Sequence, residues 1–471
     1  MATLLCGGTV VTEQDYCPAD VRIEGERIVA VGAGIGQPQD EVMDVTGHFL
    51  LPGGIDPHTH FDLSVGVTVT ADDFASGTRA ALLGGTTTII DFATQFAGET
   101  LEDALLNWHA KADSKCYTDY GFHMAITDWR PSTGHEMSAL AAQHGVVSFK
   151  LYMAYKHSLQ VEDEVILQAM SAAKDCGALI CLHCENGDIV DFLVRDSLKH
   201  ANTAPKFHPV TRPVAAEREA VERAITLAEI SEGPVYIVHL TSAPALAAIQ
   251  AARQRGVEVY AETCPQYLLL DVTAYHTADF TGAKFVMSPP LRPREHQQAL
   301  WAGLREGTID TVATDHCSFN YKGQKELGLK DFSKIPNGIP GVETRLNLLY
   351  TFGVGNGKIT LPQFVALSST QPAKLFGLYP QKGTLAVGSD ADIVVWDPHI
   401  VTTINADNLH HNCDYTPFEG FGVTGFARHV FLRGRQVVAD GKLADASPRG
   451  RYLARKPFLQ RKVGGYVYDR P

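Results

Sequence analysis

One unit recurs along the middle of this sequence and constrains the fold more than any other feature. A stretch rich in Ala and Leu ends at a glycine, and a short run of β-branched residues follows directly. The unit occurs as residues 72–83 with Gly84 and Gly85 before TTTIIDF, SALAAQHG before VVSFKLYM, VILQAMSAAKDCG before ALICLHC, ALAAIQAARQRG before VEVYAETC and QQALWAGLREG before TIDTVATDH. Glycine closes helices because it tolerates the left-handed conformation, so each unit predicts a helix followed by a strand.

The apolar character of these strand segments indicates a parallel sheet that is buried on both faces. Alternating helices and strands over residues 52–377 predict an α/β domain. Eight such units would close a (β/α)8 TIM-type barrel. A doubly wound open sheet is the alternative, and it is weakened because no GxGxxG motif follows a first strand.

The two ends of the chain have a different pattern. Residues 1–51 contain TLLCGGTVV, ADVRIEGERIVAVG and EVMDVTGHFL, and the residues after 380 contain GSDADIVVWDP and ARHVFLRGRQVVADG. Turn residues at intervals of about eight to twelve positions are typical of a β-sandwich. We therefore predict a composite β-sandwich domain from residues 1–51 and 380–471, beside a catalytic barrel at residues 52–379.

The final segment, SPRGRYLARKPFLQRKVGGYVYDRP, is locally basic with interleaved aromatic residues. We expect a solvent-exposed terminal arm, with packing against another subunit as the alternative.

Composition limits the partners and the compartment. The 471 residues include 40 Lys and Arg against 53 Asp and Glu, a net charge of −13, so no nucleic-acid partner is expected, because phosphate binding needs a basic surface. The sequence contains no run of about 18 apolar residues, so no membrane span is predicted. The start, MATLLCGGTVVTEQ, lacks signal-peptide character, and the nine scattered cysteines are an odd number. We expect a cytoplasmic protein.

Potential metal ligands fall at or near the ends of five predicted strands. In GGIDPHTHFDL two histidines are two residues apart, so a strand would direct both imidazoles to one side. Each histidine alone could be a core residue, but strand ends converge on one mouth of a barrel, where catalytic residues collect. The candidates are His58, His60, Lys150, His183, His239 and Asp315.

This set of residues suits a pair of metal ions. Four histidines and one aspartate are typical ligands of Zn²⁺, with Mn²⁺ and Co²⁺ as alternatives, and they are too many for one tetrahedral ion with an open position. Lys150 would repel the ions as an ammonium. When buried it should have a lowered pKa, and the neutral amine can take up carbon dioxide. The resulting carbamate, N6-carboxylysine, could bridge both ions.

These residues carry a resemblance to the amidohydrolase superfamily, and within it to the dihydropyrimidinase and D-hydantoinase family of cyclic amide hydrolases. The shared motifs are PGGIDPHTH, FKLYMAYK, HCEN, VHLTS, ETCPQYL, SPPLR, VATDHC and PNGIPGVE. The resemblance implies a (β/α)8 barrel with a β-sandwich built from both chain ends, and a homotetramer.

The resemblance also implies a role for each residue. His58, His60 and Asp315 would bind the more buried ion, His183 and His239 the more exposed one, and carbamylated Lys150 would bridge them. Tyr155 would offer its hydroxyl to the carbonyl oxygen, and Ser288 and Asn337 would hold the ring amide through their backbones. Substrate side-chain preference would be set around residues 63–67 and 152–159.

The implied reaction is hydrolysis of a small cyclic ureide or amide. A hydroxide bridging the two ions would attack the ring carbonyl, with Asp315 as general base and then general acid. Dihydropyrimidines or 5-substituted hydantoins would open to N-carbamoyl amino acids, of D configuration for hydantoins. The alternatives are an allantoinase or dihydroorotase of the same superfamily, a mononuclear deaminase, and a non-catalytic assembly protein such as the collapsin response mediators.

Overall fold

A computed structural model describes residues 2–458 of the chain. Within these residues, eight parallel strands form the central sheet, in the spatial order β17-β16-β15-β14-β13-β12-β11-β8. The strands are β8 (Gly54–Thr59), β11 (Thr86–Thr94), β12 (Asp119–Ala125), β13 (Ser148–Tyr152), β14 (Leu179–His183), β15 (Val235–Ile237), β16 (Val259–Thr263) and β17 (Thr311–Val312). Spatial neighbours are therefore neighbours along the chain, as in a (β/α)8 barrel.

The first and last strands meet and close this sheet. Thr59 at the end of β8 forms a parallel bridge to His316, just after β17. Further along the seam, the buried guanidinium of Arg345 donates hydrogen bonds to the carbonyls of Ile55, at 2.8 Å, and Val312, at 2.9 Å. The predicted barrel is therefore confirmed, and the open sheet is excluded.

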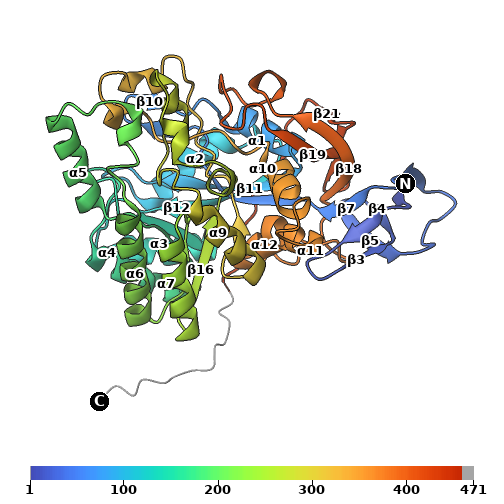
Figure 1. The fold of residues 1–471 in the computed structure, drawn as a ribbon. Coiled ribbons are helices and arrows are strands. Elements are labelled where there is room, and N and C mark those ends of the chain that lie inside the picture. The colour runs from blue at the N-terminus through green and yellow to red at the C-terminus, as the bar shows by residue number, and fades with distance from the viewer. Residues whose placement is uncertain (1, 459–471) are drawn as a thin grey trace.

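Helices connect successive barrel strands (Figure 1). They are α1 (Phe74–Leu83), α2 (Leu101–Ala112), α3 (Thr133–His144), α4 (Asp163–Cys176), α5 (Gly187–Lys199), α6 (Val214–Ser231), α7 (Ala243–Gln254), α8 (Pro265–Leu269) and α9 (Glu295–Glu306), followed by α10 (Arg345–Leu349), α11 (Leu361–Val365) and α12 (Gln371–Leu375). All five predicted helix–glycine–strand units are present. Gly145 and Gly177, for example, close α3 and α4 with φ angles of 66°, which glycine adopts at little cost.

The strands outside the barrel form two larger sheets and a hairpin. One sheet joins β1 (Thr3–Cys6), β4 (Asp20–Glu24), β5 (Arg27–Gly32) and β6 (Glu41–Asp44), and the hairpin pairs β9 (Ser64–Val65) with β10 (Thr68–Val69). The other sheet joins β2 (Thr9–Val11), β3 (Tyr16–Pro18) and β7 (Phe49–Pro52) to β18 (Ile393–Thr403), β19 (Gly422–Leu432), β20 (Arg435–Ala439) and β21 (Lys442–Leu443).

Strands from both chain ends thus share one sheet, as the sequence predicts, and Figure 1 shows the blue β7 beside the red β18. Leu5 and Val21 of the first sheet pack with Leu50, Ile393 and Phe431 of the second in one buried cluster. The domain limits at residues 51/52 and 379/380 stay predictions.

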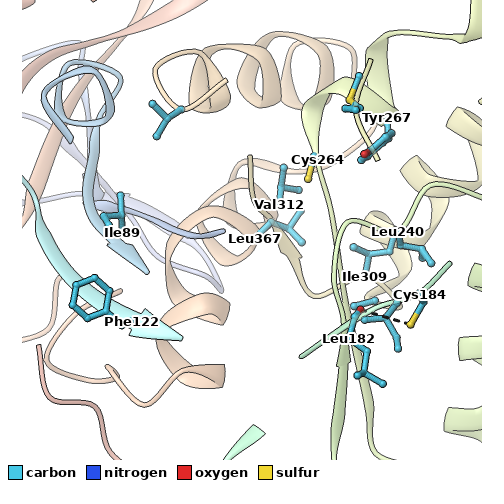
Figure 2. Packing of buried hydrophobic residues seen from close by; sticks show 14 of the residues in the cluster. Ile89, Phe122, Leu182, Cys184, Leu240, Cys264, Tyr267, Ile309, Val312 and Leu367 are labelled. Atoms are coloured by element: carbon cyan, nitrogen blue, oxygen red, sulfur yellow. Dashed lines mark hydrogen bonds between the residues drawn. The ribbon is translucent and has the colours of Figure 1, made fainter. Parts of the chain in front are cut away.

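The barrel has its own, larger hydrophobic core. Figure 2 shows Ile89 of β11 near Phe122 of β12, and Val312 of β17 near Leu367. These side chains fill the space between strands and helices, so the barrel is a packed scaffold that holds the ends of its strands in place. Among residues 2–458, no helix combines the length and the apolar character needed to cross a membrane.

The final segment differs from the expected solvent-exposed arm. Arg451 accepts a backbone hydrogen bond from Tyr120 at 3.0 Å, Leu453 donates to Tyr120 at 2.7 Å, and Phe458 donates to the carbonyl of Gly177 at 2.7 Å. The side chains of Leu453 and Phe458 are buried in an apolar cluster with residues of the barrel strands. The prediction was wrong up to residue 458 because the aromatic and leucine side chains outweigh the local basic charge. The remainder, residues 459–471, lies outside the described part of the chain.

Candidate metal centre

The six predicted ligands lie together at the carboxyl ends of the barrel strands. His58 is in β8 and His60 follows it, Lys150 is in β13, His183 ends β14, His239 follows β15 and Asp315 follows β17. All six line one cavity of about 390 Å³. The barrel therefore brings together residues that are up to 257 positions apart in the sequence, from 58 to 315.

His58, His60 and Asp315 form one candidate cation site. One potential ligand atom from each lies within 4.8 Å of the other two. Asp315 Oδ1 is 3.2 Å from His58 Nε2 and 3.3 Å from His60 Nε2. Burial lowers the pKa of His58 well below its usual value, so this imidazole is neutral and has a lone pair for a metal ion.

Glu262, in β16, orients His58 from its other side. The Glu262 carboxylate contacts His58 Nδ1, which leaves Nε2 to face Asp315. Its second oxygen accepts a hydrogen bond from the Tyr236 hydroxyl at 2.8 Å. Carboxylates placed in this way behind metal-binding histidines fix the ring orientation and increase the basicity of the ligand.

His183 and His239 form the other half of the centre. His183 Nδ1 lies 3.0 Å from His239 Nε2. His183 Nε2 is 3.0 Å from Glu185 Oε2, and Arg212 donates to the same oxygen at 2.6 Å. Burial opposes ionisation of Glu185, but Arg212 and His183 outweigh it and lower the pKa of Glu185 to about 2. The carboxylate therefore orients His183 as Glu262 orients His58.

Lys150 is buried between the two halves. Its Nζ lies 4.8 Å from the ring centre of Phe92 and 5.3 Å from that of Tyr152. Burial lowers the pKa of Lys150, which favours the neutral amine. Among the described residues, His58, His60 and Asp315 are the only three His, Cys, Asp or Glu side chains close enough to hold an ion. A second ion at His183 and His239 would therefore need a further ligand.

One nitrogen atom of the cluster supports a bound cation most directly. His58 Nε2 faces Asp315, is buried and has no hydrogen-bond partner in the part of the chain that the structure describes. The Nδ1 atoms of His60 and His239 are also buried without a partner, on the ring edges opposite the Nε2 atoms that lie near Asp315 and His183. A buried polar atom without a partner costs about 1–3 kcal/mol. Neutral imidazoles with a carboxylate are the donor set of Zn²⁺ and related divalent ions. The residues present therefore fit a divalent metal.

Three non-glycine residues that line the cavity have a left-handed backbone. The φ angles are 69° at Tyr155, 39° at His239 and 53° at Asp315. Non-glycine residues rarely adopt such angles, which cost about 1–3 kcal/mol each and are concentrated at functional sites. All three follow a barrel strand, where this conformation turns the chain across the mouth of the barrel.

The predicted substrate contacts line the same cavity. They are Tyr155 after β13, Ser288 before α9 and Asn337 after β17. Burial raises the pKa of Tyr155, so its phenol is neutral and can donate a hydrogen bond. The Arg212 guanidinium lies 5.6 Å from the Tyr155 ring centre. The structure thus gathers every predicted site residue around one cavity.

Comparison with known proteins adds the family. Residues 49–437 match the description "Amidohydrolase family". The chain belongs to the amidohydrolase family. The chain is similar to the D-hydantoinase of Geobacillus stearothermophilus, with 46% identity, and the match covers 97% of each chain.

Solved structures of similar proteins agree with this amidohydrolase assignment. The dihydropyrimidinase of Brevibacillus agri superimposes with a TM-score of 0.97 at 48% identity, over 98% of this chain and 100% of the other. The L-hydantoinase (dihydropyrimidinase) of Arthrobacter aurescens gives a TM-score of 0.86 at 29% identity, over 96% of this amidohydrolase and 99% of the other chain.

Sequence reasoning did not identify the residues behind the ligands. Glu185 and Glu262 lie in HCEN and ETCPQYL, which are motifs of the resemblance, but no spacing rule assigns a role to either glutamate. Arg212 has no local signal, because it reaches Glu185 from a loop before α6. These partners are visible only once the strands are placed side by side.

Proposed function

We propose that this amidohydrolase is a binuclear-metal enzyme that opens the cyclic amide ring of 5,6-dihydropyrimidines and 5-substituted hydantoins, giving N-carbamoyl amino acids. The observation that carries the proposal is the buried cluster of four imidazoles and Asp315 around one cavity, in which nitrogen atoms of His58 and His60 both lie within 3.3 Å of the same Asp315 oxygen. Nearly full-length similarity to proteins named hydantoinase and dihydropyrimidinase supports the substrate class.

His58, His60 and Asp315 would hold one divalent ion, Zn²⁺ first, with Mn²⁺ and Co²⁺ as alternatives. His183 and His239 would hold the second ion. Lys150, converted by carbon dioxide to a carbamate, would supply the ligand that the second site lacks. When bound, the ions supply the Lewis acidity that activates water near neutral pH and polarises the ring carbonyl.

The chain's own residues then guide the reaction. Asp315 accepts the proton of the attacking water and returns it to the leaving ring nitrogen. The neutral Tyr155 phenol donates a hydrogen bond to the carbonyl oxygen as negative charge develops there. The backbones of Ser288 and Asn337 hold the ring amide, which fixes the carbonyl carbon in line with the nucleophile.

The rim of the cavity would accept the exocyclic group of a substituted hydantoin. Leu63, Val65, Phe96 and Leu159 line it. An apolar rim favours aryl and alkyl substituents over charged ones. Identity of 46% to a protein named D-hydantoinase, against 29% to one named L-hydantoinase, supports the D enantiomer.

One alternative substrate is disfavoured by the lining of the cavity. Dihydroorotate carries a carboxylate that needs a cationic partner. Among the described residues that line the cavity there is no arginine, and the only lysine is Lys150. A non-catalytic assembly protein of the same fold is disfavoured because all six predicted ligands are present.

A ring-opening assay tests the proposal. Zinc-reconstituted protein is compared on dihydrouracil, a 5-aryl hydantoin, allantoin and dihydroorotate, each followed by loss of ring absorbance. We expect turnover of dihydrouracil or the hydantoin, and the ratio of the two separates a pyrimidine enzyme from a broad hydantoinase. Turnover of allantoin or dihydroorotate alone would contradict the proposed substrate class.

We also propose a homotetramer in the cytoplasm. The family resemblance supports the tetramer, and the nine cysteines, all free in the structure, suit a reducing compartment. Light scattering of the purified protein checks the assembly: a mass of about four times 51.1 kDa supports it, and a monomer mass contradicts it.

A further inference from the structure

Lys325 is a buried lysine next to the substrate cavity that the reaction does not use. Its side chain is fully buried, and its Nζ donates three hydrogen bonds to backbone carbonyls: Val286 at 2.8 Å, Pro336 at 2.6 Å and Gly338 at 2.7 Å. Within the described chain, the ionisable groups that influence it are two thiols, not carboxylates. An ammonium buried without a counter-ion is costly, and burial lowers the pKa of Lys325 to about 7. The three carbonyls compensate by accepting its N–H groups.

The three carbonyls belong to the two segments that carry the predicted ring contacts. Val286 precedes Ser288 by two residues, and Pro336 and Gly338 flank Asn337. The two segments also meet directly, because the Gly338 N–H donates to the Val286 carbonyl at 3.1 Å. Lys325 therefore binds both segments at once, whereas His208 and Tyr267 each reach only the segment around Ser288.

Peptide geometry shows what this tie does to Asn337. A trans peptide directs its C=O and N–H groups in opposite directions. Because the Pro336 carbonyl points at Lys325, the Asn337 N–H points away from it. Because the Gly338 N–H points at Val286, the Asn337 carbonyl points away from Val286. Asn337 lines the cavity, and these two contacts use neither its N–H nor its carbonyl, which are a donor and an acceptor of the kind that an amide ring needs.

We propose that Lys325 is a positioning residue that sets the spacing and orientation of the Ser288 and Asn337 backbones, and thereby the affinity for the substrate ring. This inference rests on the proposed function, since it assumes that a cyclic amide binds these backbones. Without the ammonium, three buried carbonyls would lose their donor, and the Asn337 segment would be free to rotate its peptide groups.

The test separates ring binding from catalysis and from folding. Lys325→Met removes all three donors at similar volume, and Lys325→Gln keeps two N–H donors without the charge. KM and kcat are measured for dihydrouracil and for a 5-aryl hydantoin, with metal content as a second readout. We expect KM to rise roughly ten-fold or more for both substrates in Lys325→Met, less in Lys325→Gln, with kcat within about three-fold and metal content unchanged.

Arg455→Met is the matched control. Arg455 is another buried cation; it donates to Ser148 Oγ at 2.9 Å and to the Phe122 carbonyl, where the final segment packs against the barrel. Its loss should lower Tm and leave KM unchanged, and Lys325→Gln serves if Lys325→Met does not fold. An active wild type whose KM is unchanged in the Lys325 variants would overturn the role of Lys325. A wild type that opens no cyclic amide would contradict the proposed function instead.

Discussion

At the amino ends of the barrel strands, Lys382 is buried among three carboxylates: Asp119 and Asp392, both at 2.6 Å, and Asp390, at 3.0 Å. At the carboxyl ends, His58 and His239 are just as buried, yet each has a ring nitrogen without a hydrogen-bond partner in the described chain. One end of the barrel satisfies its buried charge internally. At the other end, buried nitrogen atoms are left for a ligand. Residues there, such as His239 and Asp315, adopt left-handed backbone conformations that place their side chains in the cavity.

Stability and function are thus separated between the amino and carboxyl ends of the barrel. At the amino end, ion pairs join Lys382 to β12 and to the segment before β18, and backbone hydrogen bonds join the final segment to β12. Buried pairs of this kind are strongly destabilising when broken, because an unpaired charge is left behind. The carboxyl end should respond to mutation mainly through metal binding and turnover.

The largest effect is expected at Lys150. Lys150→Ala removes the proposed bridging carbamate, so the second ion loses its third ligand. We expect ring-opening activity to fall by more than about a hundredfold, a larger loss than is usual when a residue that only orients a metal ligand is changed. Bound metal should fall below two ions per chain. Elemental analysis beside the assay checks both. A variant with two tightly bound ions and normal turnover would show that Lys150 is not a ligand.

Lys382→Met should destabilise the amino end of the barrel. Asp392 would lose its cation, while Asp119 and Asp390 would keep only Arg433 and Arg27, so the free energy of unfolding should fall by about 3–5 kcal/mol. The kcat of the folded protein, measured well below Tm, should stay close to that of the wild type. Denaturant unfolding and the assay test this together, and a large loss of kcat without loss of stability would contradict the separation of the two ends.

Glu262→Gln should sharpen the contrast at the carboxyl end. Burial raises the pKa of Glu262 to about 8. The amide keeps the size of the side chain but can no longer ionise to place a negative charge behind His58 when a cation is bound. Metal affinity should weaken by about 10–100-fold, measured by competition with a chelator. Asp390→Asn at the amino end is the comparison variant, and equal metal affinity in all three proteins would count against a role for Glu262.

The smallest effect is expected at Asp445, near the start of the final segment. The Ser447 N–H, and after it Arg449, lower the pKa of Asp445 to about 2. Because the folded pKa is below the usual value of 3.8, this carboxylate stabilises the fold above about pH 4, and the contribution is lost as pH falls toward 2. Asp445→Asn should therefore lower Tm slightly at pH 7 and have a clearly smaller effect near pH 2. A decrease of the same size at both pH values would contradict this.

Much of the fold could be predicted because it depends on local patterns. The helix-ending glycines and the β-branched runs specify the barrel units, and strand ends specify where His58, Lys150 or Asp315 can meet. The seam held by Arg345 could not be predicted, because its partners Ile55 and Val312 are about 290 and 33 residues away. In the sequence Arg345 looks like an ordinary charged residue, and nothing near it indicates that it is buried.

The candidate site divides in the same way. Ligands carry a signal in their residue type and in their place at strand ends. The supporting residues carry no such signal. Glu262 acts through His58, Arg212 through Glu185, and Lys325 through backbone carbonyls, and nothing in the local sequence of any of them indicates these contacts. The final segment was mispredicted for a related reason, since its net charge is local whereas the apolar cluster around Phe458 is assembled from distant strands.

The central claim is that the carboxyl end of the barrel is a metal-dependent cyclic amidase. The most direct measurement removes metal with a chelator and then titrates Zn²⁺ back while ring opening of dihydrouracil and a 5-aryl hydantoin is followed. The account predicts that activity is lost on chelation and returns to a plateau at two ions per chain. Full activity in metal-free protein, or a plateau at one ion that further Zn²⁺ does not change, would contradict it.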